Sequence, residues 1–300
     1  MEVLPYKIYS NKDLLEAKGV HIEPKASLLV AFYNNTRFFD IVFASVENQT
    51  YKNFELVICD DGSRPDVVDH IHKAMKNTSV LVKHLWQEDK GFRKAEMLNK
   101  ALVNSDSDYM IFIDQDCVLH PEFIREHVEH KKARTALSGR RVELSPFVSD
   151  LITAEKVRKG YIEKNIWWMI PLIAHRRDSH SLKGIYIRNE KIRKLFNNKH
   201  KPIVGCNYSV HKSDLEKVNG FDMRYTIAGI AEDCDIEYRL LLEGIDIQPV
   251  CYGAVQYHLF HKLRPRDDTF VPLLNEVKAK QAKVTPFGMS LVQPQKAIQL

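Results

Sequence analysis

Two carboxylates stand one residue apart in the stretch YMIFIDQDCVLHP, at the point where an apolar run ends. Asp114 and Asp116 follow residues 110–113, whose apolar side chains are typical of a buried strand. Ionised carboxylates cost several kcal/mol to desolvate unless an opposite charge pairs with them. Because side chains two apart on an extended backbone point the same way, both could face one Mg²⁺ or Mn²⁺ ion. The structural alternative is an aspartate that caps a helix opened by Pro121.

A second acidic pair, Asp60 and Asp61, ends another apolar run in the stretch VICDDGS. A carboxylate at such a strand end can accept a hydrogen bond from the base or ribose of a nucleotide. The same residues also make an ordinary tight turn, so both interpretations stay open. Arg93 and Lys94 stand at the start of a predicted helix, where backbone N–H groups already favour anions. They indicate contacts to a diphosphate or base, or alternatively an exposed basic face.

Two further D-x-D patterns have other contexts. Asp106 and Asp108 lie in the polar stretch NSDSD and are expected to be solvated. Asp233 opens the predicted helix EDCDIEYRLLLEG, where the helix dipole stabilises an acid in the first turn and a carboxylate can also serve as a base. His258 and His261, taken alone, are more often ordinary, partly buried histidines than metal ligands.

The elements that must position these side chains alternate in type through the first half of the chain. Apolar strands are predicted at 27–33, 54–60, 80–86 and 109–114, with helices at 36–49, 65–76 and 92–105 between them. This alternation indicates an α/β fold with a mostly parallel sheet. The second half is more mixed. It is mainly helical over 145–200, followed by a strand at 206–210, a helix at 232–244 and a return to strand character.

Composition sets the wider limits. The chain has 300 residues, a net charge of +5 and 44% hydrophobic residues, which suits one large domain or two fused halves. The mild charge favours an anionic substrate or a membrane surface, and we expect no nucleic-acid partner. No apolar run is long enough to span a membrane, and the N-terminus has no signal-peptide core, so we expect a cytoplasmic protein. The five cysteines show no C-x-x-C pair and are predicted to be reduced.

The stretch NIWWMIPLIAHRR, residues 165–177, is the most apolar segment of the second half. Tryptophans flanked by cations are typical of segments that lie in a membrane interface, here at the inner face of the cell membrane. A helix of the core or of the acceptor wall, with Pro171 in it, is the alternative that we favour.

Several of these stretches occur together in a known order. LLVAFYNN, FELVICDDGS, DKGFRKAEMLNKAL and IFIDQDCVLHP resemble family 2 glycosyltransferases of the GT-A fold, a Rossmann-like fold for nucleotide-diphospho-sugar transfer. GCNYSVHKSDLEKVNGFD, EDCDIEYRLLLEGI and AVQYHLFH are similar to the C-terminal galactosyltransferase-type segment of bacterial chondroitin-polymerase and capsule enzymes. The resemblance covers about residues 26–262. It implies an N-terminal extension (1–25), a nucleotide-sugar-binding half (26–144), an acceptor-binding half (145–262) of the same domain and a tail (263–300).

The resemblance also implies roles for individual residues. Those expected at the nucleotide are Ala31 and Tyr33 beside uracil, Asp61 at the uridine, Arg93 at uracil and phosphate, and Asp114 with Gln115 in the D-x-D motif. Those expected at the metal, Mn²⁺ or Mg²⁺, are Asp116 as the main ligand, Asp114, and His258 with His261 in reserve. Asp233 matches the catalytic base, and Glu232 matches its acceptor-binding neighbour. The lead into this pair, TIAGIAED, lacks the tryptophan of the family, which puts the sugar contacts of that stretch in doubt.

The implied activity is inverting, metal-dependent transfer from a UDP-sugar to a glycan or lipid-linked glycan in bacterial surface polysaccharide synthesis. A sugar-nucleotide pyrophosphorylase is one alternative, but its glycine-rich loop is missing from AFYNNTRFF after the first strand. A non-catalytic carbohydrate-binding relative is the other, and it would be expected to have lost Asp116 or Asp233.

Overall fold

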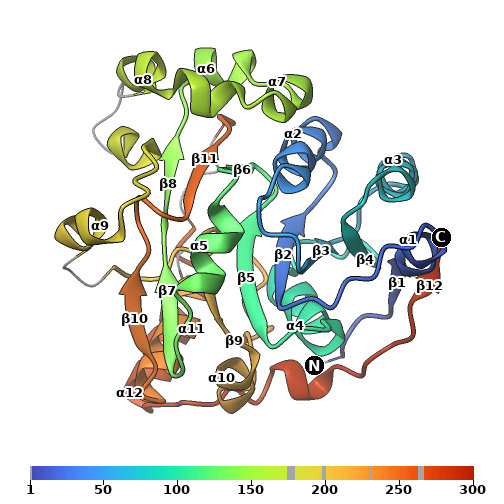
Figure 1. Ribbon diagram of the computed structural model, residues 1–300. Helices are drawn as coiled ribbons and strands as arrows, with labels where there is room; N and C mark the ends of the chain where they lie inside the picture. The colour runs from blue at the N-terminus through green and yellow to red at the C-terminus, as the bar shows by residue number, and fades with distance from the viewer. Residues whose placement is uncertain (1, 174–179, 198–200, 230, 263–266) are drawn as a thin grey trace.

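Four parallel strands form the middle of the protein. The computed structural model describes residues 2–173, 180–197, 201–229, 231–262 and 267–300. The parallel strands are β2 (Ala26–Phe32), β3 (Phe54–Asp60), β4 (Leu81–Gln87) and β5 (Tyr109–Asp114). Between them run α2 (Thr36–Glu47), α3 (Pro65–Asn77) and α4 (Lys94–Asn104). The predicted α/β alternation and mostly parallel sheet are confirmed, with element ends within about two residues of those expected (Figure 1).

The order of these strands creates a natural crevice. The chain adds β3 and β4 on one side of β2 and then returns to place β5 on the other side. The strand order therefore reverses between β2 and β5, and ligands of open α/β sheets bind at the carboxyl ends of strands at such a point. Asp114 ends β5, and Tyr33 directly follows β2.

The strands are buried on both faces, which explains their continuous apolar runs. All seven residues of β3 are buried. Alternate side chains enter two different cores: Leu28 and Ile58 pack with α2 and α3, whereas Leu29 and Val57 pack with α4. A parallel strand covered on both faces loses the alternating polar pattern of a half-exposed strand.

The chain after β5 extends the same sheet. β9 (Tyr208–His211) pairs antiparallel with β5 and also with β7 (Thr135–Ser138), and β10 (Asp246–Pro249) lies beyond β7. A small separate sheet joins β6 (Cys117–Leu119), β11 (Val255–His258) and β8 (Arg140–Glu143). The helices between β6 and β10 are α5 (Phe123–Glu129), α6 (Pro146–Leu151), α7 (Ala154–Arg158), α8 (Tyr161–Ile173), α9 (Glu190–Phe196), α10 (Lys212–Lys217) and α11 (Ala231–Leu242), with a 3-10 turn η1 (Ser181–Gly184).

The ends of the described chain complete the opposite edge of the sheet. β1 (Tyr6–Ser10) pairs antiparallel with β4, and β12 (Ile298–Gln299) pairs with β1; α1 (Lys12–Ala17) follows β1. The segment after residue 262, for which the sequence shows no strong period, contains α12 (Val271–Ala279), packed on α11, and a turn η2 (Met289–Leu291). Helix α12 buries only Leu274 and Val277, which is too few side chains for a clear helical period.

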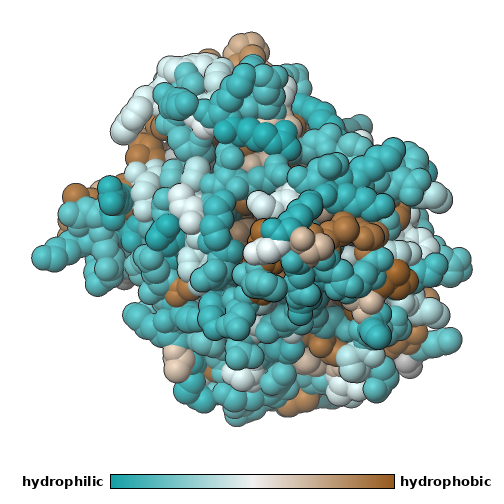
Figure 2. All heavy atoms as spheres, turned by 45° about the vertical axis from the view of Figure 1, so that its right-hand side comes forward, coloured by the Kyte–Doolittle hydropathy of each residue, from teal (hydrophilic) through white to brown (hydrophobic). Residues whose placement is uncertain are grey.

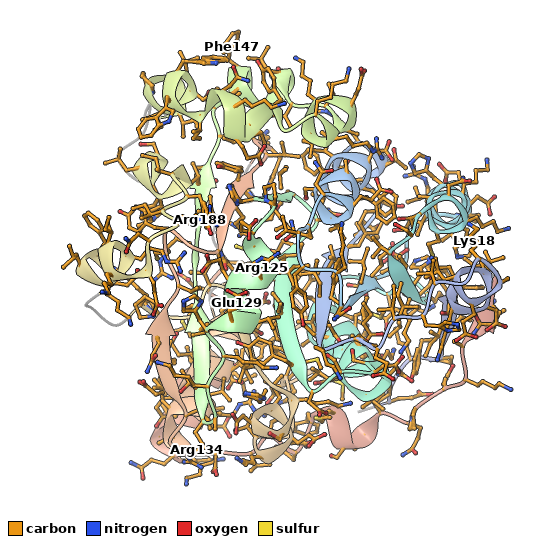
Figure 3. The ribbon with its side chains drawn as sticks, in the orientation of Figure 1. Lys18, Arg125, Glu129, Arg134, Phe147 and Arg188 are labelled. Atoms are coloured by element: carbon orange, nitrogen blue, oxygen red, sulfur yellow. The ribbon has the colours of Figure 1, made fainter. Side chains whose placement is uncertain are left out.

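Helix α8 presents apolar side chains to two environments. Ile162, Ile166, Met169 and Ile173 are buried, whereas Trp167 and Trp168 are 70% and 44% exposed. The helix packs beside α6, whose Phe147 points outward at the top of the molecule (Figure 3). None of the helices in the described residues is long and apolar enough to cross a membrane. Positions 174–177 of the predicted Trp-rich segment lie outside the described residues.

Candidate active site

A cleft of about 1280 Å³ opens at the carboxyl ends of β2, β3 and β5. The space-filling view shows a mostly hydrophilic molecule whose apolar side chains gather in smaller patches between polar ones (Figure 2). Both halves of the chain line the cleft. Its principal lining residues are Ala31, Tyr33, Asp61, Asp89, Lys94, Asp114, Gln115, Asp116, Arg140, Arg141, Glu143, Pro202, Glu232, Asp233 and His261.

The ends of β2 and β5 hold three of the predicted nucleotide residues together. Gln115 donates its backbone N–H to the carbonyl of Ala31 (3.1 Å), and its Oε1 accepts from the backbone N–H of Tyr33 (2.8 Å). The Tyr33 ring is 39% exposed, and its hydroxyl donates to Asp89 Oδ2 (2.7 Å). An aromatic ring held in this way at the cleft wall is available for stacking against a base.

Asp61 is fixed by two donors rather than left to solvent. Its Oδ1 accepts from Gln87 Nε2 and its Oδ2 from the backbone N–H of Arg93, both at 2.6 Å. Burial raises the pKa of Asp61 to about 6, although both hydrogen bonds work in the opposite direction. The neighbouring Gly62 has a φ of +99°, and a side chain there would run into the backbone of Asp89. The predicted DDGS turn therefore requires glycine at this position.

Arg93 reaches the site mainly through its backbone. Its guanidinium lies 3.6 Å from Glu96, within α4, and its side chain does not line the cleft, whereas that of Lys94 does. The predicted uracil or phosphate contact of Arg93 stays a prediction.

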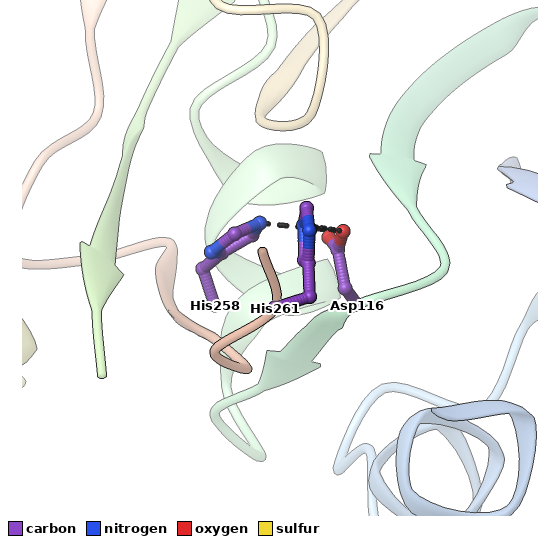
Figure 4. Close-up of side chains that lie close together, drawn as sticks. All are labelled: Asp116, His258 and His261. Atoms are coloured by element: carbon purple, nitrogen blue, oxygen red, sulfur yellow. Dashed lines mark ion pairs between the residues drawn. The ribbon is translucent and has the colours of Figure 1, made fainter. Parts of the chain in front are cut away.

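Asp116, His258 and His261 form a group that could hold a metal ion (Figure 4). His261 Nε2 lies 3.1 Å and His258 Nε2 lies 3.3 Å from Asp116 Oδ2, and the three ligand atoms lie within 4.8 Å of one another. His258 ends β11, which pairs with β6 directly after Asp116. The small sheet thus brings together residues that are more than 140 positions apart in the chain.

Glu143 orients one of these histidines. Its Oε2 lies 2.7 Å from His258 Nδ1, and its Oε1 accepts from Arg141 Nε at 2.6 Å. A carboxylate at Nδ1 leaves Nε2 as the ligand atom, the usual arrangement of metal-bound histidines. Burial alone would lower the pKa of His258, but Asp116 and Glu143 outweigh it and raise that pKa to about 9. One carboxylate and two imidazoles fit Mn²⁺ better than Mg²⁺, which prefers oxygen ligands alone.

Asp114 has a different partner. Its Oδ1 lies 2.9 Å from Lys94 Nζ, and the same nitrogen lies 3.7 Å from Glu232 Oε1. Asp114 is therefore not part of the group formed by Asp116 and the histidines. Its predicted role as a metal ligand stays a prediction that the geometry does not favour.

Glu232 and Asp233 lie in the first turn of α11 and line the cleft. Asp233 Oδ2 accepts from the backbone N–H of Gly205 (2.9 Å), and a side chain at Gly205 would overlap the Asp233 carboxylate. Burial raises the pKa of Asp233, against the effect of Lys94. Burial also raises the pKa of Glu232 to about 8, again opposed by Lys94. Two half-buried carboxylates with raised pKa values are typical of acid–base sites.

Sequence reasoning did not identify Glu143 or Gly205, and it assigned Lys94 to phosphate or base contacts. Glu143 lies in RRVEL, where a charged residue near a strand end has no distinguishing neighbour. Gly205 precedes the CNYSV stretch, and only its approach to Asp233 shows its function. The position of Lys94 beside Arg93 at the start of a helix does not indicate which carboxylates its side chain will pair with.

Comparisons with known proteins give this geometry a context. Residues 27–172 match the family described as glycosyl transferase family 2, and residues 191–262 match the N-terminal domain of galactosyltransferase. Two solved structures share the fold: S. aureus TarS (TM-score 0.52, 15% identity, 79% of this chain and 37% of that one) and the Pyrobaculum calidifontis mannosyltransferase PcManGT, solved with GDP-Man and Mn2+ (TM-score 0.53, 14% identity, 84% and 68%).

Curated relatives come from bacteria. Chondroitin synthase of Pasteurella multocida is 24% identical over 83% of this chain and 26% of its own length. The Escherichia coli glucosyltransferase WfaP is 37% identical over 30% of this chain and 34% of its own length. The chain thus spans roughly a quarter to a third of the curated relatives it matches. The fold is that of the GT-A class of glycosyltransferases. Within that class, residues 27–172, just under half of the chain, match glycosyltransferase family 2.

Proposed function

We propose that this protein transfers a sugar from a UDP-sugar to a hydroxyl of a glycan or lipid-linked glycan, with inversion at the anomeric carbon. The observation that carries the proposal is the arrangement of one cleft. The group of Asp116, His258 and His261 lies by the end of β5, and the carboxylate of Asp233 lies on the wall formed by α11. A donor diphosphate and an acceptor hydroxyl could therefore be held from opposite sides of the same anomeric carbon.

Asp233 is the proposed base. As the acceptor oxygen forms its bond to the anomeric carbon, its proton passes to Asp233, and the bond from that carbon to the diphosphate oxygen breaks. Attack from the face opposite the diphosphate turns an α-linked donor into a β-linked product. The raised pKa of Asp233 supports this role, because a base works best when its pKa approaches the working pH. We assign Glu232 to contact with the acceptor.

Mn²⁺ is the proposed cofactor, held by Asp116, His258 and His261. When bound, it would neutralise charge on the leaving diphosphate as a Lewis acid. Tyr33 and Asp61 would hold the uridine, by stacking and by accepting a hydrogen bond. We propose UDP from the resemblance of these positions to the family. The P. multocida and E. coli relatives, a chondroitin synthase and a transferase whose name specifies UDP-Glc, support a role in bacterial surface glycans.

A panel of UDP-sugars incubated with the protein and Mn²⁺ tests the proposal, with released UDP as the readout. Hydrolysis of one UDP-sugar above the others, lost on chelation and restored by Mn²⁺, is the expected result. Formation of nucleoside triphosphate and sugar phosphate from UDP-sugar and pyrophosphate would instead indicate the pyrophosphorylase. Mn²⁺-dependent UDP binding without any turnover would indicate the non-catalytic relative.

We also propose that α8 contacts the inner face of the cell membrane while the cleft binds a lipid-linked acceptor. Trp167, Trp168 and Phe147 are the exposed aromatic side chains of α8 and α6, and Lys164 is on the same helix as the tryptophans. Vesicle flotation with anionic lipid tests this part. We expect wild type to float and Trp167→Ser/Trp168→Ser to remain in solution; equal flotation of both would show that these tryptophans do not contact lipid.

A further inference from the structure

Arg140 lies at the start of β8 and lines the cleft beside Pro202. Its Nη1 donates to three oxygens: Gly139 O (2.6 Å), Pro202 O (3.0 Å) and Ser138 Oγ (3.1 Å). The guanidinium is thus held in place through one nitrogen. Its Nε and Nη2 have no partner in the part of the chain that the structure describes.

This arrangement differs from that of two neighbouring cations in the cleft. Arg141 is paired with Glu143, and Lys94 with Asp114. Among the described residues, Arg140 has no carboxylate within ion-pair distance. Glu237 is the acid that acts on it from farther away, and Glu237 Oε2 already accepts the backbone N–H of Ile203 (2.7 Å).

Two lysines add to the same positive region. Lys183 and Lys201, like Arg140, lie close enough to the buried Cys251 thiol to oppose the rise in its pKa that burial causes. Burial lowers the pKa of Lys183, and the nearby charges of Arg140 and Lys201 lower it further. These effects indicate positive charge behind Arg140, but neither lysine is among the residues that line the cleft.

The region is close in the chain to the proposed base. Pro202 O accepts from Arg140, and three residues later the backbone N–H of Gly205 donates to Asp233. The segment 202–205 thus contacts both the guanidinium of Arg140 and the carboxylate of Asp233, the proposed base. We assign an anion at Arg140 to the acceptor, because Arg140 pairs with Val255, at the opposite end of β11 from the proposed metal ligand His258.

We propose that Arg140 binds an oxyanion of the acceptor, either a carboxylate or a phosphate. This inference rests on the transferase activity proposed above. The open Nε–Nη2 edge matches the two oxygens of either group in a bidentate pair, which an ammonium group cannot reproduce. The enzyme would then prefer an acidic or phosphorylated acceptor over a neutral one.

Binding and transfer assays with Arg140→Gln and Arg140→Lys test the inference. The control, Lys18→Gln, removes the same charge from the end of α1, far from the cleft (Figure 3). Glucuronate and inorganic phosphate are titrated into each protein in the presence of UDP and Mn²⁺. We expect one of these two anions to bind wild type and Lys18→Gln with equal affinity. Its affinity for Arg140→Gln should be lower by about 10-fold or more, and its affinity for Arg140→Lys should lie between the two.

The transfer assay compares a neutral sugar acceptor with the same acceptor carrying a carboxylate or a phosphate. In Arg140→Gln the KM for the charged acceptor should rise by about 10-fold, with the neutral acceptor and UDP–Mn²⁺ affinity unchanged. Equal losses on charged and neutral acceptors, or no Arg140-dependent binding of either anion, would overturn the inference. If the anion binds through Arg140 but no UDP-sugar is ever hydrolysed, the transferase proposal fails and the anion site remains.

Discussion

Lys94 forms a half-buried ion pair with Asp114, in which Nζ and Oδ1 are 2.9 Å apart. The lysine begins α4 and the aspartate ends β5, so the pair joins two neighbouring elements at the floor of the cleft. Glu232, on α11, lies 3.7 Å from the same nitrogen. One cation therefore balances carboxylates that belong to both halves of the protein before any substrate is bound.

Replacing Lys94 by methionine should destabilise the protein by about 1–3 kcal/mol, because it leaves two half-buried carboxylates without their counter-charge. The loss should depend on pH. Burial raises the pKa of Glu232 from 4.5 to about 8 even beside Lys94, so the folded protein holds this proton more tightly than the unfolded chain does. The resulting contribution to stability is full below pH 4.5 and is lost as the pH rises through the folded-state pKa of about 8. Denaturant unfolding at pH 5.5 and 8.5 should show the larger loss at 8.5. Equal losses at both pH values would indicate packing rather than charge.

Asp116→Ala and Asp233→Asn should separate the two chemical roles in the cleft. Asp116→Ala removes a proposed metal ligand, so Mn²⁺-dependent UDP binding should weaken about 100-fold and transfer should be lost with it. Asp233→Asn keeps the size of the side chain but removes the base, so turnover should fall by about 10²-fold or more while UDP–Mn²⁺ affinity changes little. Calorimetry of UDP binding beside a transfer assay measures both. Comparable losses of UDP affinity in the two variants would mean that Asp233 is not the base.

Glu143→Gln should lower the affinity for Mn²⁺ by about 10- to 100-fold, because it weakens the group that orients His258. The readout is the Mn²⁺ concentration that gives half-maximal UDP binding. Glu129→Gln, on the exposed end of α5, serves as a control with the same chemical change. An unchanged Mn²⁺ requirement in Glu143→Gln would place the metal elsewhere.

Gly205→Ala should impair transfer while leaving the nucleotide side intact. The backbone at Gly205 lies outside the left-handed region, so alanine is conformationally acceptable, but its methyl group would overlap the Asp233 carboxylate. We expect turnover to fall by about 10-fold or more through displacement of the base, with UDP–Mn²⁺ affinity close to wild type. A parallel loss of nucleotide binding would point to a wider disturbance of the fold.

His127 should make the protein sensitive to mild acid. It is fully buried between Ser209 and Asn207, and burial lowers its pKa to about 3, although the bond to Asn207 opposes this. The unfolded chain takes up a proton near pH 6.5 while the folded protein stays neutral. The stability from this histidine is therefore full above pH 6.5 and declines as pH falls toward 3. The free energy of unfolding should be measured from pH 7 to 4.5 in wild type and in His127→Gln. As the pH falls below 6.5, wild type should lose about 1.4 kcal/mol more per pH unit than His127→Gln does.

The sequence predicted best those features that depend on local pattern. The strands β2 to β5 were predicted because each is a continuous apolar run, and Tyr33, Asp61 and Asp114 were placed together because parallel strands end at one edge. Partner choice was not predictable. Whether Asp114 binds a metal or pairs with Lys94 depends on the position of that lysine side chain. The contact between Glu143 and His258 depends on the register of β8 with β11.

The edge strands also escaped prediction, for a different reason. β1 alternates buried and more exposed residues over only five positions, and β12 is two residues long. β1 is a strand because β4 offers it an unpaired edge, and β12 is one because β1 does, rather than because of their own composition.

The position of β9 has a consequence for how the chain can be divided. Tyr208 lies in register with Phe112 of β5 on one side and with Ser138 of β7 on the other, although these strands are contributed by the first half. A strand from the later segment therefore completes the interior of a sheet that the earlier segment begins. The two family-matched segments are then not exchangeable modules. Separated, they would be complementary fragments of a single cooperative folding unit, each exposing the ladder that the other should cover.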